Sequence, residues 1–489
     1  MTEPAPGERG VRCRFAPAPT GYMHVGNART ALYNWLFARH HDGVFVLRVE
    51  DTDRQRSTEE AIGILMESLR WLAIEWNEGP GVGADYGPYR QTERLALYEE
   101  TTERFLQEGR AYFCYCTPEE LEDRRRAALK RGETPGYDGR CRNLTPAERR
   151  AFEAEGRPRA VRFAMSGQDM TVHDLIRGEA HFPANDLRDF VIMRSDGTPT
   201  YLLAAAVDDV KMEMTHVIRG EDLLPSTPRQ LQIIQSMGAN PPAYAHLPLI
   251  VGPDRQPLSK RHGSVAVEWF REQGFLPEAL VNYLALLGWS YDETTTFFTR
   301  EDLVEKFDLS RVSRNPAAFD DEKLRWMNGH YIRETDDARL AELLVQAMFQ
   351  EGLEGDLQTV AAAVPLVKTR MHTLKEGVDL IRFLFLEEIE PDEKARKMLG
   401  LERAEYLREA AARLESLKEW NHQEIEKALR ELQAERGLAS KQAFQPIRAA
   451  VTGTLISPPL FESIELLGAD RTLARLHRAA GADLPQVEI

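Results

Sequence analysis

The sequence is poor in cysteine and in long apolar runs, and both absences limit what the protein can be. Its 489 residues include only four cysteines, too few for a disulfide framework, so we expect a protein of the reducing cytoplasm. It has no apolar run of about 18 residues, so we expect no membrane partner. Residues 1–10 are polar and rich in proline and glycine, without the apolar core of a secretion signal, and predict a disordered tail.

Positive charge is also in deficit. The formal net charge is −16, with 62 Lys and Arg against 78 Asp and Glu, and we expect no DNA partner. Two local basic clusters run against this balance, one between residues 124 and 159 and one between residues 368 and 375. An acidic protein can bind RNA through such patches, and solvated helix faces explain them equally well. The sequence leaves both interpretations open.

The sequence lacks the Gly-x-x-x-x-Gly-Lys loop of common ATP-binding proteins. The nearest glycine-rich string, residues 79–83, reads as a turn because no strand and helix flank it in the required way. A different nucleotide-binding element is present at residues 14–32. There a short strand, 11–15, leads through a proline-restricted loop into a predicted helix, 27–39. A helix N-terminus favours phosphate, and His24 lies at this mouth. A plain strand, turn and helix with a packed histidine is the alternative.

The remaining patterns predict an α/β protein with a helical second half. A strand at 44–49 ends in the acidic group 50–53, and a helix at 58–72 follows. Residues 93–190 hold three of the four cysteines and most arginine clusters, which indicates an insertion. Strand signals return at 190–193, 199–203 and 216–219. Beyond about residue 265 the pattern is almost wholly helical. A chain of this length needs several domains.

The 14–32 string resembles the first signature of the class I aminoacyl-tRNA synthetases, in the form used by glutamyl-tRNA synthetases. That form is Pro-x-Pro-Thr-Gly-x-x-His-x-Gly, and here Asn27 stands in the fourth position of the His-x-Gly-His element. A second loop, 257–261, resembles the Lys-Met-Ser-Lys-Ser signature and follows about 230 residues later. The strings 324–333 and 445–453 extend the likeness from about residue 11 to 485.

The resemblance implies a Rossmann-like catalytic domain and a defined reaction. L-Glutamate is activated with ATP and Mg²⁺ to glutamyl-adenylate, then esterified to the 3′-terminal adenosine of tRNA(Glu), with activation dependent on bound tRNA. Such chemistry needs positioned groups that spread negative charge rather than a protein nucleophile. The implied catalytic residues are His24 and Lys260. The implied ATP-binding residues are His24, Gly26, Asn27, Asp222, Ile250, Ser259, Lys260 and Arg261.

Glutamate recognition needs opposed charges: a planar cation for the γ-carboxylate and a carboxylate for the ammonium. By resemblance these are supplied by a set that comprises Arg14, Ala16, Ala18, Glu50, Tyr201 and Arg219. Three positions depart from the family pattern. Ala18 replaces a common serine, Ala205 stands where some relatives carry Asn, and Pro257 replaces the first lysine of the second loop. Arg255 is close enough in sequence to replace that lysine.

Three cysteines of the insertion, Cys114, Cys116 and Cys141, suggest tetrahedral zinc. Some relatives complete the site with a histidine where this chain has Asn143, a poor ligand. Tyr137 is the fourth ligand that related enzymes suggest. His173 and His181 are alternatives, and so is an ancestral site that has lost its metal.

The expected domains follow the family. Residues 11–92 and 191–255 form the catalytic domain, 93–190 the inserted acceptor-binding domain, and 256–334 a stem-contact domain that carries the second ATP loop. Residues 335–390 and 391–489 form helical anticodon-binding domains, in which Arg370 matches a position that reads the last anticodon base. We expect a monomer. The rivals are a glutamyl-queuosine synthetase, which lacks the anticodon half, a glutaminyl-tRNA synthetase, whose anticodon domains are β-barrels, and a non-catalytic tRNA-binding paralogue.

Overall fold

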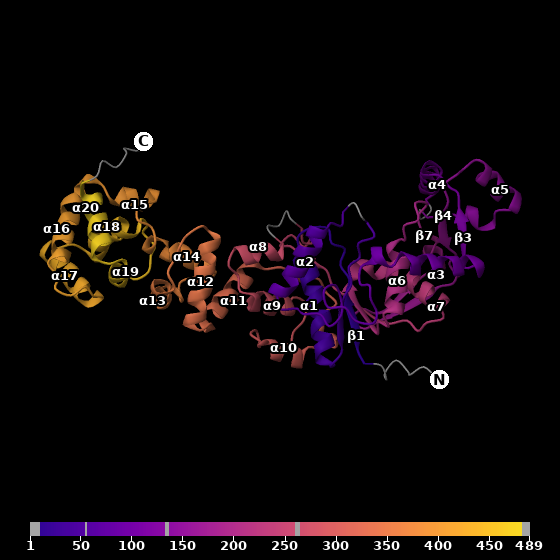
Figure 1. Cartoon of the computed structure of the whole chain (residues 1–489), viewed down its shortest axis with the longest axis horizontal. Coiled ribbons are helices and arrows are strands. Elements are labelled where there is room, and N and C mark those ends of the chain that lie inside the picture. The colour runs from indigo at the N-terminus through magenta and orange to yellow at the C-terminus, as the bar shows by residue number, and fades with distance from the viewer. Residues whose placement is uncertain (1–9, 54–55, 133–135, 260–264, 482–489) are drawn as a thin grey trace. The chain divides into compact units, whose positions relative to one another are not determined.

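The computed structural model describes residues 10–53, 56–132, 136–259 and 265–481. The chain divides into two compact units (Figure 1). The N-terminal unit comprises Met1–Trp269 and Leu280–Asp320, and the C-terminal unit comprises Phe270–Ala279 and Asp321–Ile489. The expected tail and the loop residues Lys260 and Arg261 lie outside the described residues.

A six-stranded sheet forms the centre of the N-terminal unit. Its strand order is β2 (Val44–Leu47), β1 (Arg12–Phe15), β8 (His216–Gly220), β9 (Ala243–Leu247), β5 (Met170–Asp174) and β6 (Gly178–Phe182). The first five strands pair in parallel, and β6 returns antiparallel to β5. This parallel-dominated mixed sheet confirms the predicted Rossmann-like class.

The helix that connects β1 to β2 is α1 (Val25–His40). It confirms the predicted helix over 27–39 and begins two residues earlier, and eleven of its sixteen residues are buried. The helix contacts β1, β2 and β8, and α10 (Arg300–Lys306) contacts it as well. Because α1 is covered on most sides, its N-terminus is held rigidly against the sheet. The next predicted helix is also confirmed, as α2 (Glu59–Trp71), with the Thr58 side chain capping the Ala61 amide.

A second, three-stranded antiparallel sheet contains β3 (Ala111–Cys114), β4 (Ala160–Phe163) and β7 (Phe190–Met193). The helices α3 (Leu95–Gln107), α4 (Pro118–Lys130) and α5 (Pro146–Ala154) belong to the same stretch of chain. The expected domain boundary at residues 190 and 191 does not coincide with the division between the sheets. Strands β5 and β6 precede it yet extend the central sheet, whereas β7 pairs with β4.

One sequence prediction in this unit is wrong. Residues 199–203 were predicted as a strand, but Tyr201 begins the helix α6 (Tyr201–Lys211), followed after β8 by α7 (Thr227–Ser236). The apolar run is Leu-Leu-Ala-Ala-Ala-Val, and a short apolar run cannot be assigned by periodicity alone. Its three consecutive alanines favour the helix.

The chain beyond residue 265 is helical, as predicted. It begins with α8 (Val267–Glu272) and α9 (Pro277–Leu286), and a two-stranded pair, β10 (Ile250–Val251) with β11 (Ala317–Ala318), interrupts the pattern. The helices of the C-terminal unit are α11 (Asp321–Glu334), α12 (Asp337–Gln350), α13 (Leu357–Val367), α14 (Leu374–Ile381), α15 (Glu393–Met398), α16 (Ala404–Glu415), α17 (His422–Glu435), α18 (Ser440–Thr452), α19 (Leu460–Leu467) and α20 (Ala469–Gly481).

One continuous apolar core, from Leu276 to Ala480, fills the C-terminal unit. The expected division of this half near residue 390 therefore stays a prediction. Across the described part of the chain, no helix is both long and apolar enough to cross a membrane.

Candidate active site

A cavity of about 540 Å³ opens at the carboxyl end of the central sheet. It lies where β1 and β8 end and where α1 begins, the position at which open α/β sheets bind ligands. The lining includes the predicted residues Arg14, Ala16, Ala18, His24, Gly26, Asn27, Glu50, Tyr201, Arg219, Asp222 and Ile250. Ser259 is described but does not line the cavity. The fold thus brings together residues that are far apart in the sequence, while their individual roles stay predictions.

The mouth of α1 forms one end of the cavity. His24 is the N-cap of the helix, and its Nδ1 accepts a hydrogen bond from the Gly26 amide at 3.0 Å. Burial lowers the pKa of His24. A hydrogen bond with the main chain of Leu258 opposes this shift in part. The ring is therefore neutral near pH 7, with its proton on Nε2. A Cβ at Gly26 would lie 3.2 Å from His24 Nδ1, so glycine permits this close capping geometry.

A hairpin beside the mouth of α1 also lines the cavity, through Pro257 and Leu258. The Leu258 amide donates to the Ile250 carbonyl at 2.9 Å, and the Gly252 amide donates to the Gln256 carbonyl at 2.9 Å. Pro257 lines the cavity, and its missing N–H removes no bond from this ladder. Arg255 lies exposed at the turn with a φ of 59° and is not a lining residue. Its suggested replacement of the family lysine gains no support from this position.

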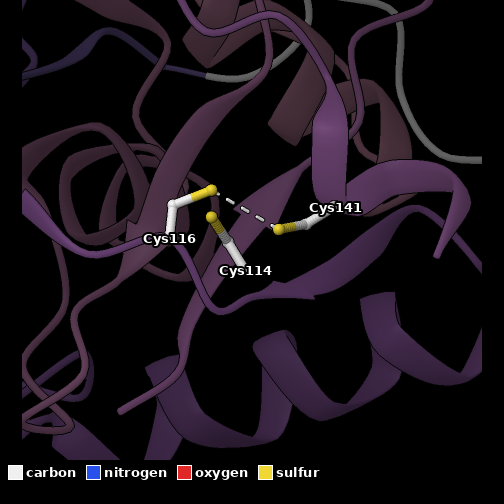
Figure 2. A group of neighbouring side chains, drawn as sticks. All are labelled: Cys114, Cys116 and Cys141. Atoms are coloured by element: carbon white, nitrogen blue, oxygen red, sulfur yellow. Dashed lines mark hydrogen bonds between the residues drawn. The ribbon is translucent and has the colours of Figure 1, made fainter. Parts of the chain in front are cut away.

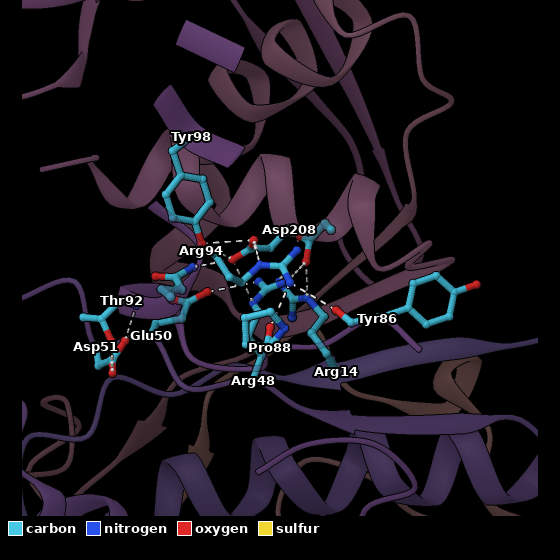
Figure 3. A network of polar contacts seen from close by, with 12 residues as sticks. Arg14, Arg48, Glu50, Asp51, Tyr86, Pro88, Thr92, Arg94, Tyr98 and Asp208 are labelled. Carbon is cyan, nitrogen blue, oxygen red and sulfur yellow. Dashed lines mark hydrogen bonds and ion pairs between the residues drawn. The ribbon is translucent and has the colours of Figure 1, made fainter. Parts of the chain in front are cut away.

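Arg14 lines the cavity and belongs to a buried ionic network (Figure 3). Its Nε and Nη2 donate to the Asp209 carboxylate at 2.9 and 3.3 Å. Arg48 donates to the same carboxylate at 2.7 Å and to Glu50 at 3.0 Å. Burial acts to raise the pKa of Asp209, but Arg14 and Arg48 outweigh it and hold that pKa below its ordinary value. Among the described residues, Nη1 of Arg14 has no partner, which leaves it for a ligand.

The network continues away from the cavity through the neighbouring carboxylate of α6, Asp208. Its oxygens accept from Arg94 Nε at 2.7 Å, from the Tyr98 hydroxyl at 2.8 Å and from Gln91 at 2.9 Å. Sequence reasoning missed Arg48, Asp208 and Asp209. Their signal was charge inside apolar runs, since Arg48 follows a buried strand and the two aspartates follow Ala-Ala-Ala-Val. Charged residues are almost never fully buried unless paired.

Glu50 differs from Asp209 in the direction of its pKa shift. Burial raises its pKa, and the nearby Arg48 and Arg14 offset this only in part. Glu50 lines the cavity. A positively charged group of a ligand beside its carboxylate would therefore favour the ionised form.

Arg219, a second arginine that lines the cavity, is held by neutral groups. Its Nη1 donates to the Tyr201 hydroxyl at 3.0 Å, its Nη2 to the Thr227 hydroxyl at 2.9 Å, and its Nε to His246 Nε2 at 3.1 Å. Arg219 is only 4% exposed. Within the described ranges no carboxylate pairs with it directly. The site therefore holds one neutralised arginine, Arg14, and one whose charge is not neutralised.

The three cysteines of the insertion lie together (Figure 2). The sulfur atoms of Cys114, Cys116 and Cys141 are all within 4.8 Å of one another, and those of Cys116 and Cys141 are 3.6 Å apart. The Tyr137 hydroxyl lies 3.6 Å from Cys114 Sγ and accepts the Cys141 amide at 2.8 Å. Hydrogen bonds from Cys116 and Cys141 lower the pKa of Cys114. A thiolate among three sulfurs fits the donor set of tetrahedral zinc.

The other suggested ligands lie elsewhere. His173 and His181 are on β5 and β6, where they face Glu179 and Asp169 at 3.4 and 3.7 Å. Neither belongs to the described cysteine group. Tyr137 is therefore the predicted fourth ligand that the fold brings to the cluster.

The basic clusters prove to be rich in ion pairs. Arg157 contacts Glu120 and Glu155, Arg142 contacts Asp189, and Lys368 contacts Asp337 at 2.6 Å. Such pairing is typical of solvated faces, although the paired side chains stay accessible. Arg370 is exposed, with Nη1 lying 3.4 Å from the Ser457 carbonyl.

Comparisons with known proteins agree with this architecture. Residues 10–326 match the family of class I tRNA synthetases (E and Q), catalytic domain. The chain belongs to this class I tRNA synthetase family. Residues 339–480 of this synthetase match a second family, the anticodon binding domain.

Relatives match over nearly the whole length. The synthetase is 46% identical over 479 residues to a glutamate–tRNA ligase of Moorella thermoacetica, covering 96% of this chain and 98% of the relative. It is 45% identical to one of Thermodesulfovibrio yellowstonii, covering 96% and 100%. A solved structure of a glutamate tRNA ligase from Elizabethkingia meningosepticum, in complex with its amino acid, superposes with a TM-score of 0.83 at 33% identity, covering 96% and 99%. The resemblance seen in the sequence is confirmed.

Proposed function

We propose that this class I synthetase is a glutamate–tRNA ligase, which joins L-glutamate to tRNA(Glu) through a glutamyl-adenylate. The observation that carries the proposal is the cavity itself. Its lining gathers Arg14, Arg219 and the carboxylate of Glu50 around Tyr201, and it also includes the neutral His24 ring at the α1 N-terminus. This polarity suits an amino acid with a second carboxylate beside a nucleotide triphosphate.

The first step follows from that polarity. The γ-carboxylate of glutamate is bound by Arg219, Arg14 and Tyr201, and the ammonium group by Glu50. The α-carboxylate oxygen attacks the α-phosphorus of ATP, and pyrophosphate leaves. His24 donates Nε2–H to the phosphate oxygens and holds the triphosphate at the helix mouth, where the main-chain amides of α1 favour negative charge.

The remaining ATP contacts complete this end. Mg²⁺ bound with ATP would neutralise phosphate charge. By family pattern Lys260 stabilises the negative charge of the transition state, with Ser259 and Arg261 supporting the loop. Gly26, Asn27, Asp222 and Ile250 also line the cavity, and we assign them to ATP; Ala16 and Ala18 line it as well, and we assign them to glutamate.

In the second step a ribose hydroxyl of the 3′-terminal adenosine attacks the glutamyl carbonyl carbon of the adenylate, the ester forms and AMP leaves. We assign acceptor binding to residues 93–190, stem contacts to 256–334 and anticodon binding to 335–390 and 391–489, with 11–92 and 191–255 as the catalytic domain. The match of residues 339–480 to an anticodon binding domain supports the last assignment. Arg370 reads the last anticodon base in this proposal, and activation depends on bound tRNA. We further propose a cytoplasmic monomer.

We also propose that zinc binds Cys114, Cys116, Cys141 and Tyr137. Three converging sulfurs and the adjacent hydroxyl support it. Zinc would hold together the β3 end and the 137–141 loop, a structural role. Metal analysis of the purified protein should give about one zinc per chain, and a content well below that would contradict the site. Tyr137→Phe should lower zinc affinity more than Asn143→Ala.

The deciding experiment is ATP–pyrophosphate exchange with glutamate, with and without tRNA(Glu). Exchange that requires tRNA is the expected result. Tight tRNA binding without exchange would instead favour a non-catalytic tRNA-binding paralogue, although no comparison supports that alternative. Parallel charging of tRNA(Glu) and tRNA(Gln) separates a strict glutamate enzyme from one that charges both.

A further inference from the structure

Arg219 is a buried cation whose contacts are all neutral, and this is unusual. A buried charge normally pairs with an opposite charge. Here the described acceptors are the hydroxyls of Tyr201 and Thr227, the Leu223 carbonyl at 3.4 Å and His246 Nε2. The nearest carboxylate in this chain of contacts is Asp174, which reaches Arg219 only through the imidazole of His246.

The contact with Asp174 fixes the protonation of His246. Nδ1 of His246 lies 2.6 Å from Asp174 Oδ2, and both side chains are buried. A carboxylate can only accept, so Nδ1 carries the proton and Nε2 is left with a lone pair. That lone pair accepts Nε–H of Arg219 at 3.1 Å. Burial lowers the pKa of His246, with Asp174 offsetting this in part, which keeps the ring neutral.

Asp174 is itself held in place by the main chain. Its Oδ1 accepts the amides of Ile176, Arg177 and His246 at 3.0, 2.8 and 3.2 Å. The residue ends β5, which lies beside β9 in the central sheet, and β9 in turn pairs with β8. Three neighbouring strands thus present Asp174, His246 and Arg219 in a row. The row is rigid because each side chain is anchored on a sheet strand.

The ring of Tyr244 closes the row from one side. It stacks parallel to His246, with centroids 6.0 Å apart, and the Arg219 guanidinium carbon lies 5.3 Å from the Tyr244 centroid. Neither contact neutralises charge. The Arg219 side chain is therefore fixed in direction by hydrogen bonds and packing, while one hydrogen of Nη1 has no acceptor among the described residues.

We propose that His246 and Asp174 are positioning residues for amino-acid specificity. They orient Arg219, but the imidazole of His246 separates the Asp174 carboxylate from it. The positive charge of Arg219 therefore stays available for the γ-carboxylate of glutamate. This rests on the proposed role of Arg219. A carboxylate in direct contact with Arg219 would neutralise it, and the pocket would then accept the neutral amide of glutamine more readily.

The test is tRNA-dependent ATP–pyrophosphate exchange with glutamate and with glutamine. His246→Gln supplies one donor and one acceptor at similar spacing and should stay within about threefold of the wild-type KM. His246→Leu removes both groups and should raise the glutamate KM by about tenfold or more, with a smaller change in kcat. Asp174→Asn should act in the same direction. His173→Gln, on the exposed face of the same strand, is the matched control and should change neither constant.

A double variant that conserves total charge tests directly whether the separation of the carboxylate from Arg219 matters. His246→Glu combined with Asp174→Asn moves the carboxylate into contact with Arg219 without changing total charge. It should lower the ratio of kcat/KM for glutamate over glutamine by at least about tenfold. An unchanged ratio, or a loss in kcat at constant KM in His246→Leu, would overturn the proposal. Thermal melting of each variant identifies any that fail to fold. If His246→Leu is among them, the nearly isosteric Asp174→Asn still decides the question: a raised glutamate KM supports the proposal, and an unchanged KM overturns it.

One further variant separates this inference from the proposed function. If Arg219→Gln leaves glutamate KM unchanged, Arg219 does not read the substrate and the assignment of the pocket fails. If Arg219→Gln raises KM while His246→Leu and Asp174→Asn match wild type, only the positioning proposal fails.

Discussion

Arg14 and Arg219, two arginines that line the cavity, are held in opposite ways. Arg14 lies beside Arg48 (Figure 3), and the two share the carboxylate of Asp209 at distances of 2.9 and 2.7 Å. Arg219 contacts two hydroxyls, a carbonyl and a neutral imidazole. Both are buried and both line the same cavity. One is electrically neutralised by the fold, and the other is not.

This difference separates two tasks. Removing one partner of a buried ion pair destabilises the folded state, because the other partner is left as a buried unpaired charge. Arg14 and Asp209 therefore couple the pocket to folding. Arg219 has no such partner, so the protein bears the cost of a buried cation that glutamate can offset. Substitution of Arg219 should therefore change mainly the glutamate KM, and substitution of Asp209 should change mainly the free energy of unfolding.

The largest expected effect comes from removing the shared carboxylate. Asp209→Ala leaves Arg14 and Arg48 buried without their acceptor and should lower the free energy of unfolding of the N-terminal unit by about 3–5 kcal/mol. Chemical denaturation measures it. The control is Asp53→Ala, which breaks an exposed pair with Arg56 at 2.8 Å and should cost less than about 1 kcal/mol. Equal losses in both variants would contradict the ionic role of Asp209.

Replacing the unneutralised arginine should change binding more than folding. Arg219→Gln should raise the glutamate KM about 100-fold, or about 2.7 kcal/mol, because hydrogen bonds to charged groups are lost. Its melting temperature should change little, since its partners are neutral. Arg177→Gln, which loses a peripheral contact with Glu221, is the control and should stay within about threefold. A melting loss as large as that of Asp209→Ala would end the distinction between the two arginines.

At Glu50, stability of the fold and binding of the substrate should favour opposite protonation states. Its pKa in the folded protein lies above the ordinary value of 4.5 because burial disfavours the ionised form. The folded state then binds this proton more tightly than the unfolded chain. Stability from this group is therefore fullest below pH 4.5 and is lost as the pH rises through the raised pKa. Ionised Glu50 weakens the fold at neutral pH.

Glu50→Gln should consequently hold or slightly increase the free energy of unfolding at pH 7, while raising the glutamate KM about 10- to 100-fold through loss of the ammonium partner. In the wild type, glutamate binding should begin to fail at a pH above 4.5 on acidification. Denaturation and exchange assays at a series of pH values check both statements. Destabilisation by Glu50→Gln at pH 7 would show that Arg48 depends on Glu50 more than burial opposes it.

Much of this site could be predicted from the sequence because its residues follow strand ends. The strand before Glu50 and the loop and helix around His24 were predictable from periodicity and glycine positions, and the resemblance supplied Arg14, Tyr201 and Arg219. The cavity includes all of them. Tyr201 was nevertheless expected on a strand and begins α6, since a short apolar run fits either structure.

The supporting side chains could not be predicted in the same way. Asp174 was placed in the insertion because residues 93–190 differ in composition from their flanks, yet β5 joins the central sheet beside β9. His246 is separated from Asp174 by 72 residues and from Arg219 by 27. Only sheet order makes them neighbours, and strand order is not encoded in the local pattern of any one strand. Asp208 and Asp209 show the same limit, since their arginine partners come from β1, the end of β2 and η1 (Gln91–Glu93) with its flank.

The smallest expected effects come from two hydroxyl groups, one in contact with Arg219 and one in the ionic network around Arg14. Tyr201→Phe removes the neutral acceptor of Arg219 at 3.0 Å and should raise the glutamate KM about fivefold, or about 1 kcal/mol, with no loss of stability. Tyr98→Phe removes a donor to the Asp208 carboxylate at 2.8 Å and should lower stability by about 1.5 kcal/mol with little change in KM. Exchange kinetics and denaturation of both variants give the comparison. If both hydroxyls affected the same quantity, the ionic network and the Arg219 row would be one structural unit, because a shared response requires that the two be coupled.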